Sequence, residues 1–386
     1  MLRRTLALLL TLALCLPCLS AAAEDNSALD AGFENAFRRN KTIGAAVVIA
    51  KDGQIVYQYQ YGVMSKKTKE PVTAETYFKI ASVTKMISGI YMMQLVEQGV
   101  LDLDTDISKY LGYTVRNPYY KKIPVTLRNL MTHTSSLSTK GGFSKLSSTL
   151  SSMISTKGKN SNWYREKPGS VYRYSNFGAG IMGSIIESVM KQNLNDAIRA
   201  GVFAPLSIDA SYAARYLEHP ENIPTIYSEK KTTYMTAQAS IDEKWDEEPD
   251  PDMHFRLTVG ALWIKPTDLC RLGMMLCDGG TVDGVTLLQP ETVALMMSEQ
   301  RGQGNITAKT PYGLCVHHET TLVPGRTIYG HQGISHGYLC NVYYDPETRF
   351  VFVLCTNGST NSLNNHVTNL SRRTFALAWE AYSGLE

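Results

Sequence analysis

The pattern of apolar and polar positions changes sharply along the first hundred residues. Residues 27–39 have the spacing of an amphipathic helix. An apolar run over 43–50, the turn Lys51-Asp52-Gly53 and an alternating stretch over 54–61 predict a β-hairpin. A short apolar run then ends at Ser82, where a different period begins.

From Val83 onward, apolar residues recur at helical spacing until Gly99, which is typical of a helix C-cap. Ser82 is therefore predicted at the N-terminus of a buried helix. Lys85 follows three residues later, so its side chain lies on the same helix face, one turn away.

The last third of the chain is predicted to be mostly strand. The predicted strands cover 312–316, 327–330, 337–344 and 349–356, and a closing helix covers 363–382. Short connections between them indicate antiparallel pairing. Residues 260–264 are also expected to return to the β core, directly before a helix that begins at 265–268.

The order of these elements predicts an α+β fold. One antiparallel β-sheet, built from about 24–80 and 256–386, is flanked by N- and C-terminal helices, and a mostly helical region of about 81–255 interrupts it. Within that region, 211–255 is polar and without a period, as expected of a lid, a substrate wall or an insert.

Residues 1–23 are typical of a secretory signal peptide. Arg3 and Arg4 precede an apolar run over 6–16, and Ala21-Ala22-Ala23 offers small residues for cleavage. Removing the two arginines lowers the net charge from +3 to +1, so nucleic acid is not an expected partner. No later stretch is long and apolar enough for a transmembrane anchor, and an extracytoplasmic location is predicted, either secreted, periplasmic or on the cell surface.

The cysteines and acidic clusters do not predict a metal site or a cofactor. Cys15 and Cys18 lie in the signal core, and the other five cysteines lack zinc-site spacing, so buried thiols are expected, with a disulfide left open. The alternating acids Asp102, Asp104 and Asp106 lack the glycine and the glutamate of a calcium loop and are interpreted as a solvated turn.

Another formal motif, Gly178-Ala179-Gly180-Ile181-Met182-Gly183, matches G-x-G-x-x-G. A dinucleotide site needs a β-α-β unit whose second strand ends in an acid, and the nearest acid, Asp196, falls in a helical pattern. Close helix packing is the better interpretation of these small residues.

Ser82 and Lys85 have the spacing of a nucleophile and its base. A serine hydroxyl is weak until a base takes its proton, and a lysine can be that base when desolvation lowers its pKa. The helix N-terminus adds N–H groups that favour developing negative charge. The alternative is an N-cap serine with a surface lysine, so partners elsewhere must decide.

A second candidate stretch brings Tyr174 and Asn176 to one side of an extended segment, at period two. A tyrosine near cations can share a proton with a serine, and an asparagine can donate to a substrate amide. His133 follows a capped helix; it is a possible catalytic residue, but a histidine that bonds its own turn is the favoured interpretation.

A third stretch supports two competing motifs. One is His331-Gln332-Gly333; the other is Gly333-Ile334-Ser335-His336-Gly337, a formal G-x-S-x-G elbow. An elbow must turn from strand into helix, whereas 338–344 is rich in β-forming residues. The context therefore disfavours Ser335 as the nucleophile.

The order Ser82-x-x-Lys85, Tyr174-x-Asn176, His331-x-Gly333 resembles the serine β-lactamase and penicillin-binding protein superfamily, in its class C β-lactamase and D-alanyl-D-alanine carboxypeptidase branch, which includes esterases. The resemblance covers nearly the whole chain after the signal and implies the β-lactamase/transpeptidase-like fold, an antiparallel sheet with helices on both faces.

The resemblance also implies roles for these residues. Ser82 would be acylated, and Lys85 and Tyr174 would exchange its proton. Asn176 would hold the substrate amide and Lys85. The backbone N–H groups of Ser82 and Ile334 would form an oxyanion hole, worth roughly 3–4 kcal/mol per donor in acyl-transfer enzymes.

One departure affects the predicted substrate. The third motif begins with lysine in the β-lactamases themselves, whereas His331 is largely neutral near pH 7. The prediction is an exported serine hydrolase that cleaves an amide or ester of a small-molecule or peptide substrate, first a D,D-carboxypeptidase-like or β-lactamase-like peptidase acting on a cell-wall peptide or a β-lactam. A small-ester or D-alanyl esterase and a non-catalytic penicillin-binding sensor are the alternatives.

Overall fold

The structure, a computed structural model, describes residues 25–139, 148–155, 161–244, 247–300, 311–360, 362–364 and 366–384. The predicted signal peptide, with Cys15 and Cys18, lies outside these residues.

Six strands form the main antiparallel sheet, in the spatial order β10-β11-β12-β13-β1-β2. Their bounds are β1 Gly44–Lys51, β2 Gln54–Gly62, β10 His317–Glu319, β11 Ile328–Ser335, β12 Tyr338–Asp345 and β13 Phe350–Thr356. The predicted N-terminal hairpin is therefore confirmed. Because β1 pairs with β13, the N-terminal hairpin and the C-terminal strands form one continuous sheet.

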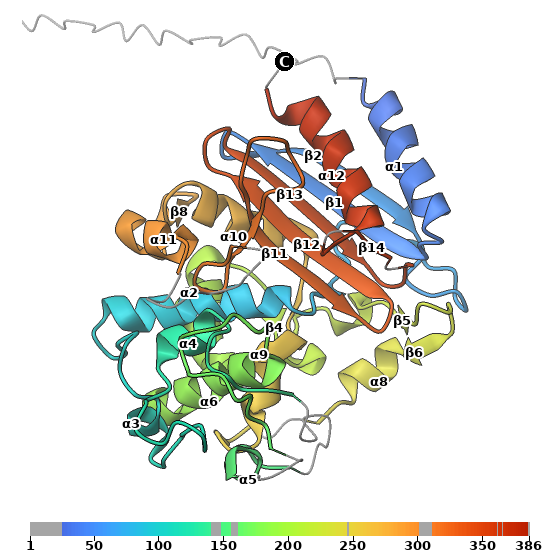
Figure 1. Ribbon diagram of the computed structural model, residues 1–386. Coiled ribbons are helices and arrows are strands. Elements are labelled where there is room, and N and C mark those ends of the chain that lie inside the picture. The colour runs from blue at the N-terminus through green and yellow to red at the C-terminus, as the bar shows by residue number, and fades with distance from the viewer. Residues whose placement is uncertain are drawn as a thin grey trace, which may run out of the picture.

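One face of this sheet is covered by the two terminal helices, α1 (Ser27–Arg39) and α12 (Asn369–Tyr382), which lie side by side (Figure 1). Their apolar faces bury aromatic rings such as Phe33, Phe37 and Phe375 against the outward-facing residues of the strands. The helix predicted at 27–39 matches α1 residue for residue.

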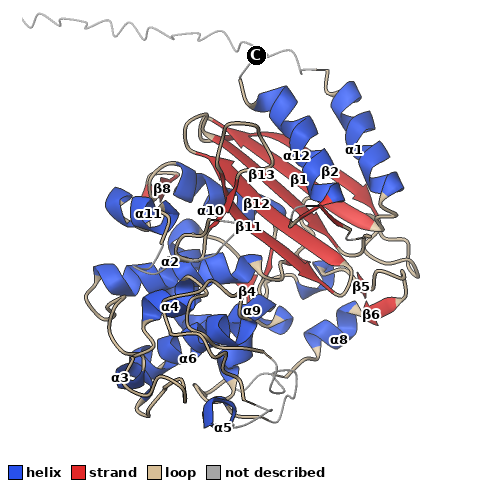
Figure 2. Cartoon of the chain, in the orientation of Figure 1, coloured by secondary structure: helices blue, strands red, loops and turns tan. Residues whose placement is uncertain are grey.

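The opposite face meets α10 (Pro266–Cys277) and, beyond it, a cluster of helices (Figure 2). The remaining α-helices of the described residues are α2 Val83–Glu97, α3 Ser108–Leu111, α4 Leu127–Met131, α5 Leu150–Ser155, α6 Asn176–Met190, α7 Leu194–Ile198, α8 Ala237–Ile241, α9 Leu257–Gly260 and α11 Pro290–Met297. Helix α2 is buried from Val83 to Leu95 and is central to this side of the molecule. The boundaries predicted between sheet and helical regions stay a prediction.

The other strands of the described residues are only two or three residues long. They are β3 Phe78–Lys79, β4 Ala210–Ser211, β5 Ile226–Tyr227, β6 Thr233–Met235, β7 Trp263–Ile264, β8 Thr281–Val282, β9 Val285–Thr286, β14 Leu363–Asn364 and β15 Val367–Thr368. The polar stretch 211–255 thus contains short helices and strands rather than one loop.

Three local predictions were wrong. Residues 312–316 are not a strand, because the chain there makes a single bridge, Tyr312 with His317. Strand β7 pairs with β3 and β4 in a separate three-stranded sheet, not with the main sheet. The closing helix begins at Asn369 rather than 363, because the Thr368 side chain caps it by accepting from the N–H of Ser371.

The packing of α6 explains its glycines. A Cβ at Gly180 would lie 2.2 Å from the carbonyl oxygen of Phe255, and one at Gly183 would lie 3.1 Å from Thr258. The small residues therefore let α6 approach the chain around α9, which confirms that the G-x-G-x-x-G is a packing motif.

The other structural predictions concern thiols, acids and membrane spans. The five cysteines of the described residues are free and buried. Asp104 and Asp106 form ion pairs with Arg128 and Arg116. In the described ranges no three His, Cys, Asp or Glu side chains are arranged to hold a metal ion. None of the helices formed by those same residues has the length and apolar character needed to cross a bilayer.

Candidate active site

Ser82 lies where the chain passes from β3 into the buried helix α2. It is the N-cap residue of α2, and its hydroxyl makes no capping hydrogen bond. The residue before it, Ala81, has a φ of 47°, in the left-handed region that costs a non-glycine residue about 1–3 kcal/mol. A strained turn thus presents, at the helix N-terminus, a hydroxyl that is not used for capping.

Lys85 is fully buried one turn further along α2. Its Nζ lies 2.9 Å from Ser82 Oγ and 2.8 Å from the carbonyl oxygen of Val259, at α9. Within the described part of the chain it has no carboxylate partner. Burial therefore lowers its pKa to about 7, because the ammonium loses hydration that no opposite charge replaces.

Tyr174 reaches the same hydroxyl from the loop before α6. The side chain of Ser82 hydrogen-bonds the phenol, and burial in the site raises the pKa of Tyr174 above its ordinary value, although 39 % of the residue is exposed. Lys85 Nζ lies 5.2 Å from the centre of the ring. The serine, the amine and the phenol predicted from three motif positions are therefore brought together.

Asn176 follows Tyr174 by two residues, in a different conformation from the one predicted. It is the first residue of α6, not part of an extended segment, because Ser175 caps the helix by accepting from the N–H of Gly178. Its amide oxygen Oδ1 is buried and has no hydrogen-bond partner among the described residues.

Gly333 allows strand β11 to contact the start of α2. A Cβ at this position would lie 2.3 Å from the carbonyl oxygen of Ile80 and 2.9 Å from the backbone nitrogen of Ser82. Ile334 follows and pairs with Leu339 next to a two-residue hairpin turn. In such a hairpin this second pair does not exchange hydrogen bonds, so the N–H of Ile334 points to the open edge of β11.

His331 lies beneath the site rather than on its surface. It is fully buried, its Nδ1 donates to the carbonyl oxygen of Gln332 at 2.8 Å, and the hydroxyl of Tyr312 lies 3.3 Å from its Nε2. Burial, together with nearby His317 and Lys85, holds the pKa of His331 well below its ordinary value. It is therefore neutral at physiological pH.

Sequence reasoning did not predict the aromatic and imidazole side chains that surround the catalytic candidates. The preference for His133 as a histidine that bonds its own turn was wrong. Its Nδ1 accepts from the N–H of Ser175 at 3.2 Å, and its ring centre lies 4.2 Å from that of Tyr174. Burial and the neighbouring Lys85 and His317 lower the pKa of His133. It anchors the loop that carries the phenol.

His317 is the other missed residue. Its ring lies 4.1 Å from that of His331 and 6.4 Å from that of Tyr174. Its Nδ1 is 3.6 Å from Glu319 Oε1, and its buried Nε2 has no partner among the described residues. In the sequence, only the His-His-Glu run of β10 could have indicated that His317 belongs to the site.

The elbow interpretation fails in the structure. Ser335 is the last residue of β11, and the turn after it leads into β12, not into a helix. Its Oγ lies 2.7 Å from Nδ1 of His336. Asp345, the acid that would follow Ser335 in a serine-acid-histidine order, has its carboxyl group bound by Arg326 at 2.9 Å and by Thr348.

The site has the composition of the β-lactamase and transpeptidase class. It combines a serine at a helix N-terminus, a buried lysine one turn further on, a phenol from a second element and a strand whose glycine allows close approach to that helix. The beta-lactamase family model matches residues 29–373, so the chain belongs to the beta-lactamase family.

Individual relatives agree with this assignment. Penicillin-binding protein 4 of Amycolatopsis lactamdurans is 29% identical over 332 residues, which is 82% of this chain and 81% of that protein. Esterase EstB of Burkholderia gladioli is 34% identical over 117 residues, 30% of each chain. A solved class C beta-lactamase has a TM-score of 0.71 at 16% identity, covering 94% of this chain and 97% of its own. The predicted superfamily and fold class are confirmed.

Proposed function

We propose that this protein is a serine hydrolase that cleaves an amide or ester bond through a covalent acyl-enzyme on Ser82. The observation that carries the proposal is the 2.9 Å contact between Ser82 Oγ and the Nζ of a fully buried Lys85 whose pKa is about 7. A lysine in solution is almost entirely protonated at neutral pH, whereas this one is about half neutral there.

In the acylation step, the neutral amine of Lys85 is the general base. Its lone pair takes the Ser82 proton while one of its N–H groups donates to the carbonyl oxygen of Val259 at 2.8 Å. Tyr174 is the weaker candidate for this role, because burial raises its pKa and keeps the phenol protonated. The structure of the free protein thus favours the lysine over the tyrosine.

Tyr174 is suited to the following proton transfer. After Ser82 attacks, the leaving nitrogen or oxygen needs a proton, and the phenol that hydrogen-bonds the serine is a proton donor on the same atom. Lys85, now charged, lies 5.2 Å from the centre of the phenol ring and stabilises the phenolate that results. In deacylation the Tyr174 phenolate takes a proton from the water that attacks the acyl carbon, and Lys85 returns its proton to Ser82 Oγ as the acid is released.

The N–H groups of Ser82 and Ile334 form the oxyanion hole, because Gly333 brings β11 against the start of α2. The unpartnered Oδ1 of Asn176 accepts an N–H from the substrate. Both contributions are electrostatic and preorganised.

The first proposed substrate is a D-amino-acid-containing peptide of the cell-wall type. The long match to penicillin-binding protein 4 supports it, covering most of both chains. The same similarity and the predicted signal peptide support an extracytoplasmic location.

An ester substrate is the second candidate, and the neutral His331 favours it. A fully buried imidazole with a lowered pKa gives no permanent charge for a substrate carboxylate. The local match to esterase EstB supports this alternative. A non-catalytic penicillin-binding sensor is the third, and the arrangement of Ser82, Lys85 and Tyr174 argues against it.

Intact-mass spectrometry with peptide mapping tests the proposal. The protein is incubated separately with a fluorescent penicillin, a p-nitrophenyl ester and an N-acyl-D-Ala-D-Ala peptide. We expect an acyl adduct on Ser82 that Ser82→Ala abolishes and Ser335→Ala retains. An adduct on Ser335, or neither an adduct nor turnover with any of the three, would overturn the proposal.

The lifetime of the adduct separates the candidates. Slow release of penicillin with turnover of the peptide identifies a peptidase, and rapid turnover of the ester alone identifies an esterase. A stable penicillin adduct without turnover of either other substrate identifies a sensor.

A further inference from the structure

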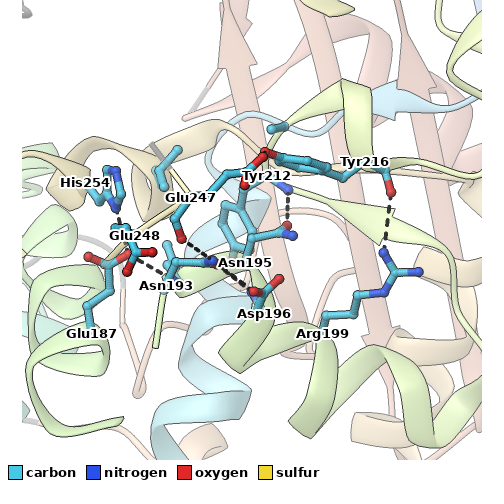
Figure 3. Close-up of a pocket in the computed structure, with 13 residues that line it drawn as sticks. Glu187, Asn193, Asn195, Asp196, Arg199, Tyr212, Tyr216, Glu247, Glu248 and His254 are labelled. Atoms are coloured by element: carbon cyan, nitrogen blue, oxygen red, sulfur yellow. Dashed lines mark hydrogen bonds and ion pairs between the residues drawn. The ribbon is translucent and has the colours of Figure 1, made fainter. Parts of the chain in front are cut away.

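A cavity of about 460 Å³ opens on the helical side of the molecule (Figure 3). It lies between the C-terminal half of α6, α7, the segment that follows β4 and the chain around His254. Helix α6 begins with Asn176 at the active site, and Glu187 is 11 residues further on, about 16 Å along the helix axis. The cavity is therefore a separate place from the site of Ser82.

The carboxyl group of Glu187 lies in the wall of this cavity, beside His254 (Figure 3). Glu187 is 1 % exposed, and its Oε1 accepts from His254 Nδ1 and from the N–H of Leu194, both at 2.8 Å. The other oxygen, Oε2, is buried and has no hydrogen-bond partner among the described residues. A buried carboxylate oxygen without a donor is destabilising, because it loses hydration that no hydrogen bond replaces.

The rest of the lining carries an excess of negative charge. Asp196, Glu247 and Glu248 line the cavity with Glu187, and Arg199 is the arginine among the lining residues. The guanidinium of Arg199 donates to the carbonyl oxygen of Tyr216, another lining residue, at 3.4 Å. A cation entering the cavity meets several carboxylates, whereas an anion meets repulsion.

The remaining walls combine polar groups, among them the amides of Asn193 and Asn195, with apolar and aromatic side chains. Leu194, Leu257 and the ring of Tyr212 line the cavity, and all three residues are buried. No set of three His, Cys, Asp or Glu in the described residues has the arrangement of a metal site. The lining thus combines one orphan acceptor, an acidic rim and an apolar surface, a composition suited to an organic cation rather than a metal ion.

We propose that this cavity binds a small organic cation, whose ammonium group donates to Glu187 Oε2 and whose apolar body lies against Leu257 and Tyr212. The proposal is independent of the hydrolase activity, because it uses none of the residues assigned to catalysis.

Isothermal titration calorimetry on Ser82→Ala protein tests the proposal without turnover. The probe is 2-phenylethylamine, compared with 2-phenylethanol, its neutral isostere, and phenylacetate, its anionic counterpart. We expect the amine to bind at least tenfold more tightly than the alcohol, phenylacetate not to bind, and the amine's affinity to fall with added salt. Equal affinity for amine and alcohol, or no heat with the amine at millimolar concentration, would overturn the proposal.

Substitutions then locate the site. Glu187→Gln keeps an oxygen for His254 and Leu194 but removes the charge, and we expect it to weaken amine binding at least tenfold. Glu248→Gln, an exposed change on the rim, is expected to weaken binding by at most about threefold. The control is Glu380→Gln, an exposed carboxylate on α12 behind the main sheet, which should leave binding unchanged.

Unchanged amine binding in a folded Glu187→Gln protein would show that the glutamate only joins α6 to α7 and would refute the proposal. If that variant fails to fold by circular dichroism, the comparison of amine with alcohol and the Glu248→Gln variant still decide. Failure here leaves the acyl-enzyme proposal untouched, because the mass measurement on Ser82 does not depend on this cavity.

Discussion

Lys85 and Glu187 are both ionisable, both buried and both carried by helices that pack against each other, yet their surroundings differ. Lys85 faces a hydroxyl, a carbonyl and neutral imidazoles, with no carboxylate partner in the described chain. Glu187 receives two N–H donors, one of them from His254. A buried lysine without an opposite charge nearby has a lowered pKa and can act as a base. A buried carboxylate that accepts hydrogen bonds is held in place and acts as a structural group or a binding group.

The two places are also physically connected. Tyr212, which lines the cavity, places its hydroxyl 2.8 Å from that of Ser88, on the turn of α2 after Lys85. Leu257 lines the cavity at the start of α9, and Val259 of the same helix accepts from Lys85. The buried lysine and the buried glutamate therefore lie within a few helical turns of each other, in opposite electrostatic surroundings.

The largest expected effect tests the lysine as a base. Lys85→Ala should lower the acylation rate by about 10²–10⁴-fold. In the unsubstituted protein the rate should rise with pH and level off above about pH 7, because only the neutral amine accepts the Ser82 proton. Stopped-flow measurement of the p-nitrophenol burst from about pH 5 to about pH 9 checks both. Lys109→Ala, an exposed lysine on α3, is the matched control. A normal burst in Lys85→Ala would remove the lysine from the mechanism.

The second effect separates the tyrosine from the lysine. Tyr174→Phe should lower amide cleavage by about 10²-fold or more, and acylation by a p-nitrophenyl ester by much less, because nitrophenolate leaves without a proton. Steady-state kinetics on an amide and an ester with the same acyl group measure the difference. Equal losses on both substrates would instead make Tyr174 a base for Ser82. Tyr119→Phe, an exposed tyrosine, serves as the control.

The third effect concerns the approach of β11 to α2. Gly333→Ala introduces a Cβ that would lie 2.3 Å from the Ile80 carbonyl oxygen, so the strand must move and carry the N–H of Ile334 with it. We expect kcat to fall by about 10²-fold with a smaller change in KM. Gly32→Ala is the control, because its Cβ meets only the flexible side chain of Leu377. A fully active Gly333→Ala protein would exclude this strand from the oxyanion hole.

The smallest effect is on stability, and it has opposite signs at the two residues. The pKa of Lys85 falls from 10.5 to about 7 on folding, so the folded state disfavours the charged form. The destabilisation is complete below pH 7, at most roughly 5 kcal/mol, and disappears as the pH rises to 10.5. Lys85→Met should therefore be more stable than the unsubstituted protein at about pH 6, and this advantage should shrink at higher pH.

Glu187→Met should instead be less stable than the unsubstituted protein. It leaves the N–H groups of His254 and Leu194 without their acceptor and is expected to cost about 1–3 kcal/mol. Thermal unfolding of both variants at several pH values measures the contrast. A destabilised Lys85→Met protein at pH 6 would mean that its contacts with Ser82 and Val259 outweigh the desolvation of its charge.

Elements with a strong period were predictable. The helix at Ser27–Arg39 and the hairpin after it follow from residue spacing alone, as does the buried helix that begins after Ser82. Errors fell on short segments, where a few residues carry little periodicity. The chain after Tyr312 makes only a bridge, and Thr368 starts α12 later than the apolar pattern indicates.

The sequence by itself determined the spacing of Ser82 and Lys85 on one helix face, because i and i+3 are neighbours on any helix. It also supplied Tyr174 and Gly333 as motif members. Only the tertiary structure decided that His133 holds the tyrosine loop and that, among the described residues, Lys85 has no carboxylate partner and Glu187 Oε2 has no hydrogen-bond partner. Those properties depend on desolvation and on contacts between segments far apart in the chain, and local periodicity contains no information about either.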